Sequence, residues 1–200
     1  MLNENIYFTL TFLIFAYLIG SIPFGVIISK LNSKIDIQKV GSGNIGATNV
    51  FRSVSKISGI ITLLADVLKG YLPVLIACYL FSKPWVGLIG LFNFLGHLYP
   101  VYLKFRGGKG VAVALGIFLA LAPLAIMIEI IIFIIVLLKW RYVSLGSITS
   151  ALTFPIILGL LNYEAYYIML SLVISILIIY KHKDNLKNLL ISEENKFSLK

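Results

Sequence analysis

The strongest constraint on this chain is its long aliphatic runs. Stretches such as 126–138 and 170–180 offer no polar face to water. Hydrophobic residues make up 60% of the 200 residues and charged residues only 12%, whereas soluble domains carry about a quarter charged residues. We therefore expect an all-α, polytopic membrane helical bundle. This composition excludes intrinsic disorder and nucleic-acid binding, and the lone Cys78 excludes an intrachain disulfide.

The number of membrane spans depends on how residues 111–138 are divided. They form one apolar run interrupted by Pro123, and proline ends or kinks a helix. Two helices there make seven spans and one helix makes six. The first of the two is the weakest span, because about 12 residues rise only about 18 Å. The expected spans are 6–28, 57–80, 85–103, 111–122, 124–138, 142–161 and 165–181.

The basic residues favour seven spans and set the orientation. With the N-terminus outside, seven spans place fifteen of the 17 Lys and Arg residues in cytoplasmic segments. Six spans would move Lys139, Arg141 and the basic tail outside, against the positive-inside rule. We therefore predict about seven transmembrane helices and a cytoplasmic C-terminus. A single domain is expected over 1–200, with a cytoplasmic tail from about residue 182 that forms an interfacial helix.

A glycine-rich segment at 41–52 is the first place where polar residues gather. Its glycines have the spacing G-x-G-x-x-G, but a dinucleotide-binding loop needs a preceding strand and a βαβ unit, and open sheets do not cross membranes. Glycines can still turn N–H groups toward an anion, and Arg52 can grip a phosphate with two hydrogen bonds. A capped short helix with a snorkelling arginine is the plainer alternative. The candidate residues are Gly41, Ser42, Gly43, Asn44, Thr48, Asn49 and Arg52.

The second polar segment, 105–111, surrounds one lysine with glycines at the mouth of a helix. Helix N-termini carry free N–H groups and partial positive charge, so they bind phosphate. The segment is not a Walker A loop, because no Ser or Thr follows the lysine. A flexible basic turn is the alternative, although three glycines around one lysine exceed what a turn needs. The candidate residues are Gly107, Gly108, Lys109 and Gly110.

Several polar residues stand singly near the expected cytoplasmic face. His97 could face a site or bond a neighbouring helix. Ser144 and Ser147, three residues apart, could bind substrate or ease helix packing. His182 and Asn185 share a helix face where the last span leaves the membrane, and a solvated start of the tail is the alternative there.

Three ionisable residues lie within the expected spans. Asp66 and Lys69, at i and i+3, are interpreted as a mutually neutralising structural pair, and Glu129 receives no assignment. Two histidines, one cysteine and scattered acids make no metal site, so no metal or cofactor is expected. No serine or cysteine has an evident base and acid partner. Together the motifs predict a cytoplasm-facing site for phosphorylated, anionic substrates at the lipid boundary.

In their order along the chain, these motifs resemble those of the bacterial acyl-phosphate:glycerol-3-phosphate acyltransferases, the PlsY family of integral membrane enzymes. The resemblance runs nearly end to end, and its most specific part is the nine-residue block 41–49. The other matching parts are Arg52, Asp66 with 68–70, 96–100, 107–111, and 144–147 with His182 and Asn185.

The resemblance implies transfer of a fatty acyl group from acyl phosphate to the 1-hydroxyl of sn-glycerol 3-phosphate. The products would be lysophosphatidic acid and phosphate, made for phospholipid biosynthesis in the bacterial inner membrane, with membrane lipids around the enzyme. It also implies seven spans with the N-terminus outside. In the family, the serine and arginine of the first motif are important for activity, and they fall on Ser42 and Arg52. The second motif is a phosphate-binding loop, here with Lys109, and the third motif's histidine and asparagine fall on His182 and Asn185.

The third motif departs from the family pattern at three positions. The usual arginine after the histidine is Lys183, a later arginine is Asn188, and a glycine before the glutamate is Ser192. These differences leave the role of residues 183–192 open. The first two motifs carry no such departures.

The mechanism we expect is direct attack of the glycerol 3-phosphate hydroxyl on the acyl carbonyl, without an acyl-enzyme. Positioning and charge neutralisation would supply much of the rate. The base is open between a substrate phosphate oxygen, His97 and His182. The rival function is a transporter of organic phosphate, against which stand the lack of a visible repeat and the one-sided polar residues. The expected catalytic residues are Ser42, Arg52, His97, Lys109, His182 and Asn185.

Overall fold

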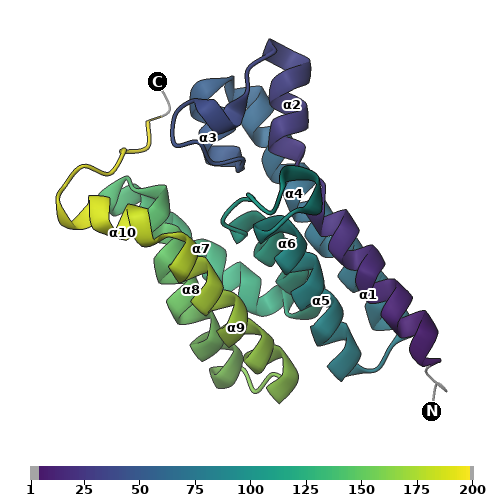
Figure 1. The fold of residues 1–200 in the computed structure, drawn as a ribbon. Helices are drawn as coiled ribbons and strands as arrows, with labels where there is room; N and C mark the ends of the chain where they lie inside the picture. Colours follow the sequence, from purple (N-terminus) through teal and green to yellow (C-terminus); the bar gives the residue numbers. More distant parts are fainter. Residues whose placement is uncertain (1–4, 199–200) are drawn as a thin grey trace. The chain divides into compact units, whose positions relative to one another are not determined.

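The computed structural model describes residues 5–198, which form helices and loops with no strand among them (Figure 1). This confirms the all-α expectation. The chain divides into two compact units, Met1–Leu121 and Ala122–Lys200. The single-domain expectation stays a prediction.

The described part of the first unit, residues 5–121, is built from six α-helices and two short 3₁₀ turns. Its expected first span is interrupted, because the helix breaks at Ile22 and Pro23, where proline supplies no N–H for a continuing helix. The elements are α1 (Ile6–Ser21), α2 (Phe24–Ser33), η1 (Ile37–Lys39), α3 (Ala47–Ser53), α4 (Lys56–Leu80), α5 (Lys83–Leu98), η2 (Val101–Leu103) and α6 (Val111–Leu121).

Close helix packing in this unit depends on glycine. Helix α4 packs against α6, and α1 packs against α5. A Cβ on Gly70 of α4 would overlap the backbone carbonyl of Val113, and a Cβ on Gly116 of α6 would overlap that of Val67. Small residues at such crossings let helix backbones approach closely, which is the usual way helices associate in lipid. Helix α4 thus lies directly against the first turns of α6.

The second unit contains α7 (Pro123–Trp140), α8 (Val143–Leu160), α9 (Ala165–Lys181) and α10 (Lys183–Leu190). Helix α8 packs against both α7 and α9. Helix α7 exposes most of its aliphatic side chains, as expected of a surface that faces lipid, and buries Glu129 against α8. There Thr153 donates to the Glu129 carboxylate, with Oγ1 at 3.0 and 3.1 Å from its two oxygens.

The helix boundaries agree closely with the expected spans, and Pro123 divides 111–138 into two helices as predicted. Among residues 5–198, five helical segments are long and apolar enough to cross a membrane, and α9 with α10, bent by 57°, could make a sixth. Helix α6 is shorter. The chain is therefore a multi-pass membrane protein, while the count of seven and the orientation stay predictions. Residues Lys183–Leu190 form the expected helix of the tail, and its interfacial position also stays a prediction.

Candidate functional site

The first glycine-rich loop, residues 41–46, is organised by Asn49 of α3. The buried Asn49 side chain accepts the Ser42 N–H through Oδ1 at 3.1 Å. A Cβ on Gly41, which has a φ of 58°, would overlap this side chain. One asparagine therefore holds the first residues of the loop. Its Nδ2 donates to three carbonyls, those of Ile37 at 3.2 Å, Val40 at 3.0 Å and Asn44 at 2.9 Å.

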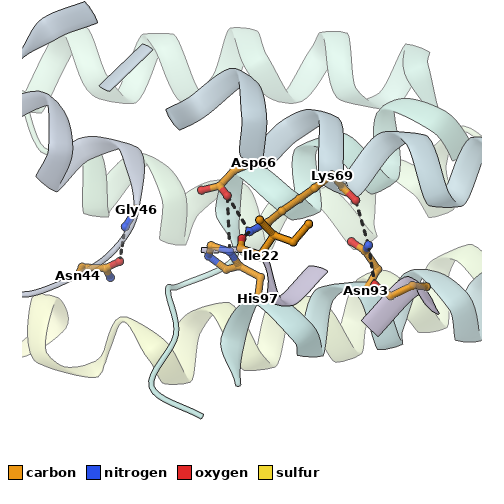
Figure 2. A network of polar contacts seen from close by, with 8 residues as sticks. Ile22, Asn44, Gly46, Asp66, Lys69, Asn93 and His97 are labelled. Carbon is orange, nitrogen blue, oxygen red and sulfur yellow. Dashed lines mark hydrogen bonds and ion pairs between the residues drawn. The ribbon is translucent and has the colours of Figure 1, made fainter. Parts of the chain in front are cut away.

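A small apolar cluster anchors the first loop, and one of its members, Ile45, belongs to the loop itself. Ile37, Ile45 and Val50 are buried in that cluster. The side chain of Asn44 accepts the N–H of Gly46 at 2.8 Å, just before α3 begins (Figure 2). This bond closes a turn directly before the first residue of α3.

The three candidate residues of α3 differ in their exposure. Arg52 is exposed, Thr48 is partly exposed, and Asn49 is only 5% exposed. Because the amide of Asn49 is engaged with the loop, its first role is structural. The substrate-binding roles expected for Ser42, Thr48, Asn49 and the loop glycines stay predictions.

The second glycine-rich loop, residues 107–110, lies directly against the end of α5. The Gly108 N–H donates to the carbonyl of His97 at 3.1 Å. A Cβ on Gly108 would overlap the His97 ring, and one on Gly107 would overlap the His97 carbonyl. Gly110 has a φ of 86°, in the region that favours glycine. Each of the three glycines is therefore required by the path of the loop.

Lys109 stands in the middle of this second loop, half buried. Helix α6 begins at Val111, immediately after the loop. The N–H groups of its first turn, which have no partner within the helix, therefore lie beside the lysine. A lysine and a helix N-terminus together form a favourable environment for a phosphate group.

His97 is buried, with 4% of its surface exposed, and it contacts the pair from α4 (Figure 2). Its Nδ1 lies 3.9 Å from Oδ1 of Asp66, and the same oxygen lies 2.8 Å from Nζ of Lys69. The expected ion pair between Asp66 and Lys69 is confirmed. Its contact with His97 was not predicted, because nothing in the spacing of residues 66 and 97 indicates that they meet.

In the second unit, His182 lies buried at the junction of α9 and α10. Its Nδ1 is 2.8 Å from the carbonyl of Ile178. A carbonyl can only accept, so Nδ1 donates the hydrogen bond to it. This bond sets the orientation of the buried ring.

Glu194 joins two of the predicted residues of the second unit, and sequence reasoning missed it as a site residue. Its Oε1 accepts from Ser144 Oγ at 2.7 Å and from Asn185 Nδ2 at 2.8 Å. The sequence held one signal for Glu194, because the third motif of the family contains a glutamate after position 192. Ser147 instead donates to the carbonyl of Val143 in its own helix at 2.9 Å. That bond agrees with its alternative role in helix packing.

The predicted residues therefore divide between the two units. In the first unit the structure places the second loop on His97. In the second unit it brings Ser144 and Asn185 together through Glu194. Convergence of the two groups around one substrate stays a prediction. Within residues 5–198 no group of three or more His, Cys, Asp or Glu side chains could hold a metal ion.

Comparisons with known proteins agree over nearly the whole chain. A family model described as glycerol-3-phosphate acyltransferase matches residues 10–192. The chain is 48% identical over 183 residues to the glycerol-3-phosphate acyltransferase of Geotalea daltonii, covering 91% of this chain and 94% of that protein. It is 44% identical over 198 residues to that of Geobacter sulfurreducens, covering 98% and 99%.

Solved structures of an integral membrane protein are similar as well. The chain matches the crystal structure of PlsY, an integral membrane glycerol 3-phosphate acyltransferase, in its glycerol 3-phosphate form with a TM-score of 0.92 and 42% identity, over 95% of this chain and 96% of that one. It matches the lysophosphatidic acid form with a TM-score of 0.89 and 41% identity, over 95% of each chain. The chain thus belongs to the glycerol-3-phosphate acyltransferase family, the family that its motifs resemble.

Proposed function

We propose that this chain transfers a fatty acyl group from acyl phosphate to the 1-hydroxyl of sn-glycerol 3-phosphate. As a member of its family it is an acyltransferase, and glycerol 3-phosphate is the substrate that its relatives' names support. The observation that carries the proposal furthest is the second loop. There Lys109 stands between three glycines at the start of α6, an arrangement suited to a phosphate group.

Both substrates carry phosphate, so the site needs positive charge and N–H donors. We assign Arg52 and Lys109 to the phosphate of glycerol 3-phosphate, and backbone amides with neighbouring polar side chains to the headgroup of acyl phosphate. Arginine can form two parallel hydrogen bonds to one phosphate. The acyl chain would lie between helices, open to lipid. Held in this way, the hydroxyl and the acyl carbonyl are close enough to react.

The chemical step is a direct displacement. The 1-hydroxyl oxygen forms a bond to the acyl carbonyl carbon, the bond from that carbon to the phosphate oxygen breaks, and the hydroxyl proton passes to phosphate. Lysophosphatidic acid and inorganic phosphate leave, and no acyl-enzyme forms. Both histidines are buried, and the Nδ1 of each faces a protein oxygen. Their burial supports a substrate phosphate oxygen as the base.

The proposed location is the bacterial inner membrane, with the N-terminus outside and the site facing the cytoplasm. The positive-inside rule supports this orientation. Single cysteines placed at Lys83 and Lys104 in a Cys78→Ser background test it, because an impermeant thiol reagent added to intact cells should label only position 83. Labelling of position 104 alone would reverse the orientation.

The reaction is tested with purified protein given acyl phosphate and glycerol 3-phosphate. We expect release of phosphate and formation of lysophosphatidic acid in equal amounts. Protein that binds both compounds but releases neither product would instead support a transporter of organic phosphate. An acyl group trapped on Ser42 would overturn direct attack.

Arg52→Ala tests the proposed phosphate contact. We expect turnover to fall by about 100- to 1000-fold, the usual cost of removing a charge-stabilising donor. Lys39→Ala is the matched control, because it removes a positive charge whose side chain is 81% exposed beside the first loop. The control should retain normal turnover. Normal turnover in Arg52→Ala would remove Arg52 from the site.

A further inference from the structure

We propose that Asp66 and Lys69 are positioning residues for the second loop and that they act on it through His97. This inference rests on the proposed role of residues 107–110 in holding glycerol 3-phosphate. The sequence interpretation gave this pair only mutual neutralisation. The contacts around the pair link it step by step to the loop.

The pair is completely enclosed and held in one geometry. Both side chains are 3% exposed, and Nζ of Lys69 lies 2.8 Å from Oδ1 of Asp66. The same Nζ donates to the carbonyl of Ile22 at 2.7 Å, at the break between α1 and α2. Burying an ion pair carries a large desolvation cost, and ionisable groups inside membrane bundles usually mark function. Mutual neutralisation alone does not explain why Asp66 and Lys69 are buried together in spite of this desolvation cost.

Asp66 also faces His97, on the neighbouring helix α5. Its Oδ1 lies 3.9 Å from Nδ1 of the histidine, an electrostatic contact longer than a hydrogen bond (Figure 2). A carboxylate at this position favours the proton on Nδ1 and sets the orientation of the ring. Lys69 in turn keeps the carboxylate in place.

His97 then holds the second loop in two ways. Its carbonyl accepts the N–H of Gly108 at 3.1 Å. Its ring lies so close to Gly108 that a Cβ there would overlap Nε2, Cε1 and Cδ2. Because Lys109 is the next residue, a shift of the ring would displace the backbone that carries this lysine.

Helix α4 reaches the other end of the loop as well. Gly70, the residue after Lys69, abuts the backbone of Val113 in the first turn of α6. Asn93 of α5 donates to the carbonyl of Lys69 at 2.9 Å and to that of Ala16 at 3.1 Å. One short segment of α4, residues 66–70, therefore supports the elements on both sides of the loop.

The test compares the double variant Asp66→Asn/Lys69→Met with Thr62→Ala. The double variant removes both charges together, so neither is left unpaired. We expect its KM for glycerol 3-phosphate to rise about 10- to 100-fold, the effect of a small misplacement, with KM for acyl phosphate within about twofold of wild type. Thr62→Ala, also in α4, removes a buried side chain and its 2.8 Å hydrogen bond to the carbonyl of Ser58. Its Tm should fall while both KM values stay normal.

A normal KM for glycerol 3-phosphate in the double variant would overturn the inference, and so would an equal rise of both KM values. If the double variant does not fold, Asp66→Glu keeps the charge and shifts it by one methylene. This variant should show the same selective rise of KM, and normal kinetics there would also overturn the inference.

A double-mutant cycle tests the route through His97. Adding Asp66→Asn to His97→Gln should raise the KM for glycerol 3-phosphate no further than His97→Gln alone, whereas additive effects would overturn the route. Calorimetry of the same variants measures their Kd for glycerol 3-phosphate, which reports a change in the loop without requiring turnover. Wild-type protein that binds this compound but transfers no acyl group would contradict the proposed function and leave this inference measurable.

Discussion

The two glycine-rich loops of the first unit are held by different means. The first loop (41–46) is closed by the amide of Asn49, whose hydrogen-bond partners all lie within 12 residues along the chain. The second loop (107–110) rests on His97, which in turn contacts Asp66 of another helix. The hydrogen bonds of the first loop are local in the sequence, but the second loop needs α4, α5 and α6 in place. Substitutions that are far from the second loop in the sequence should therefore change how this loop binds substrate.

The largest expected effect comes from adding one carbon to the second loop. In Gly108→Ala the new Cβ overlaps the His97 ring, so the loop must move, and we expect KM for glycerol 3-phosphate to rise about 100-fold. Gly87→Ala is the control, because a Cβ there meets nothing within 4 Å and it lies in α5, the helix that carries His97. Steady-state kinetics should leave the control unchanged. A normal KM in Gly108→Ala would separate this loop from substrate binding.

A smaller effect is expected from the local loop. Asn49→Asp keeps the acceptor for the Ser42 N–H but places an acidic oxygen against three carbonyls. We expect about 2 kcal/mol of lost stability, because buried acceptors lose their donor. Ser53→Ala, which removes one 3.3 Å hydrogen bond to Asn49, should cost under about 1 kcal/mol. Thermal unfolding in detergent measures both, and equal losses would show that Asn49 does not organise the loop.

Backbone positions with positive φ angles allow a further comparison, between the first loop and the tail. Glycine occupies these angles in the first loop, at Gly41 and Gly43, but Ser192 of the tail has a φ of 61°. This is the position where the family pattern has glycine. Ser192→Gly should therefore raise stability by about 1 kcal/mol, since side chains strain a left-handed backbone. A lower Tm in this variant would mean that the serine side chain stabilises the tail.

The smallest effect is expected at the buried acid of the second unit. Thr153→Val removes the hydroxyl that donates to Glu129 and should cost about 0.6 kcal/mol, as typical hydrogen bonds between membrane helices do. Both KM values should stay normal, in contrast to the Asp66 variants. A selective change in KM for glycerol 3-phosphate would show that buried acids of both units position the substrate.

Much of the fold was predictable, because its signals are local. Apolar runs marked the helices, Pro123 correctly divided 111–138, and the i,i+3 spacing correctly paired Asp66 with Lys69. The break at Pro23 was missed, although the same rule applies to that proline.

The candidate site was predictable as a set of residue types and not as an arrangement. Nothing in the spacing indicates that the side-chain amide of Asn49 forms its hydrogen bonds within its own loop. An asparagine that binds a ligand and an asparagine that holds a turn look the same in a sequence. Nor does it indicate that Glu194 contacts Ser144, which lies 50 residues earlier. Such contacts depend on helix packing and have no local signal.

By itself, then, the sequence determined that the protein lies in a membrane, where its helices are, and which kinds of side chain its motifs contain. These properties follow from hydropathy, proline and glycine, which act over a few residues. Only the tertiary structure decided which charged side chains contact the residues that hold the loops. Asp66 became a neighbour of His97 because α4 packs beside α5 and α6. Such closeness between distant residues follows from packing, which no spacing along one chain reveals.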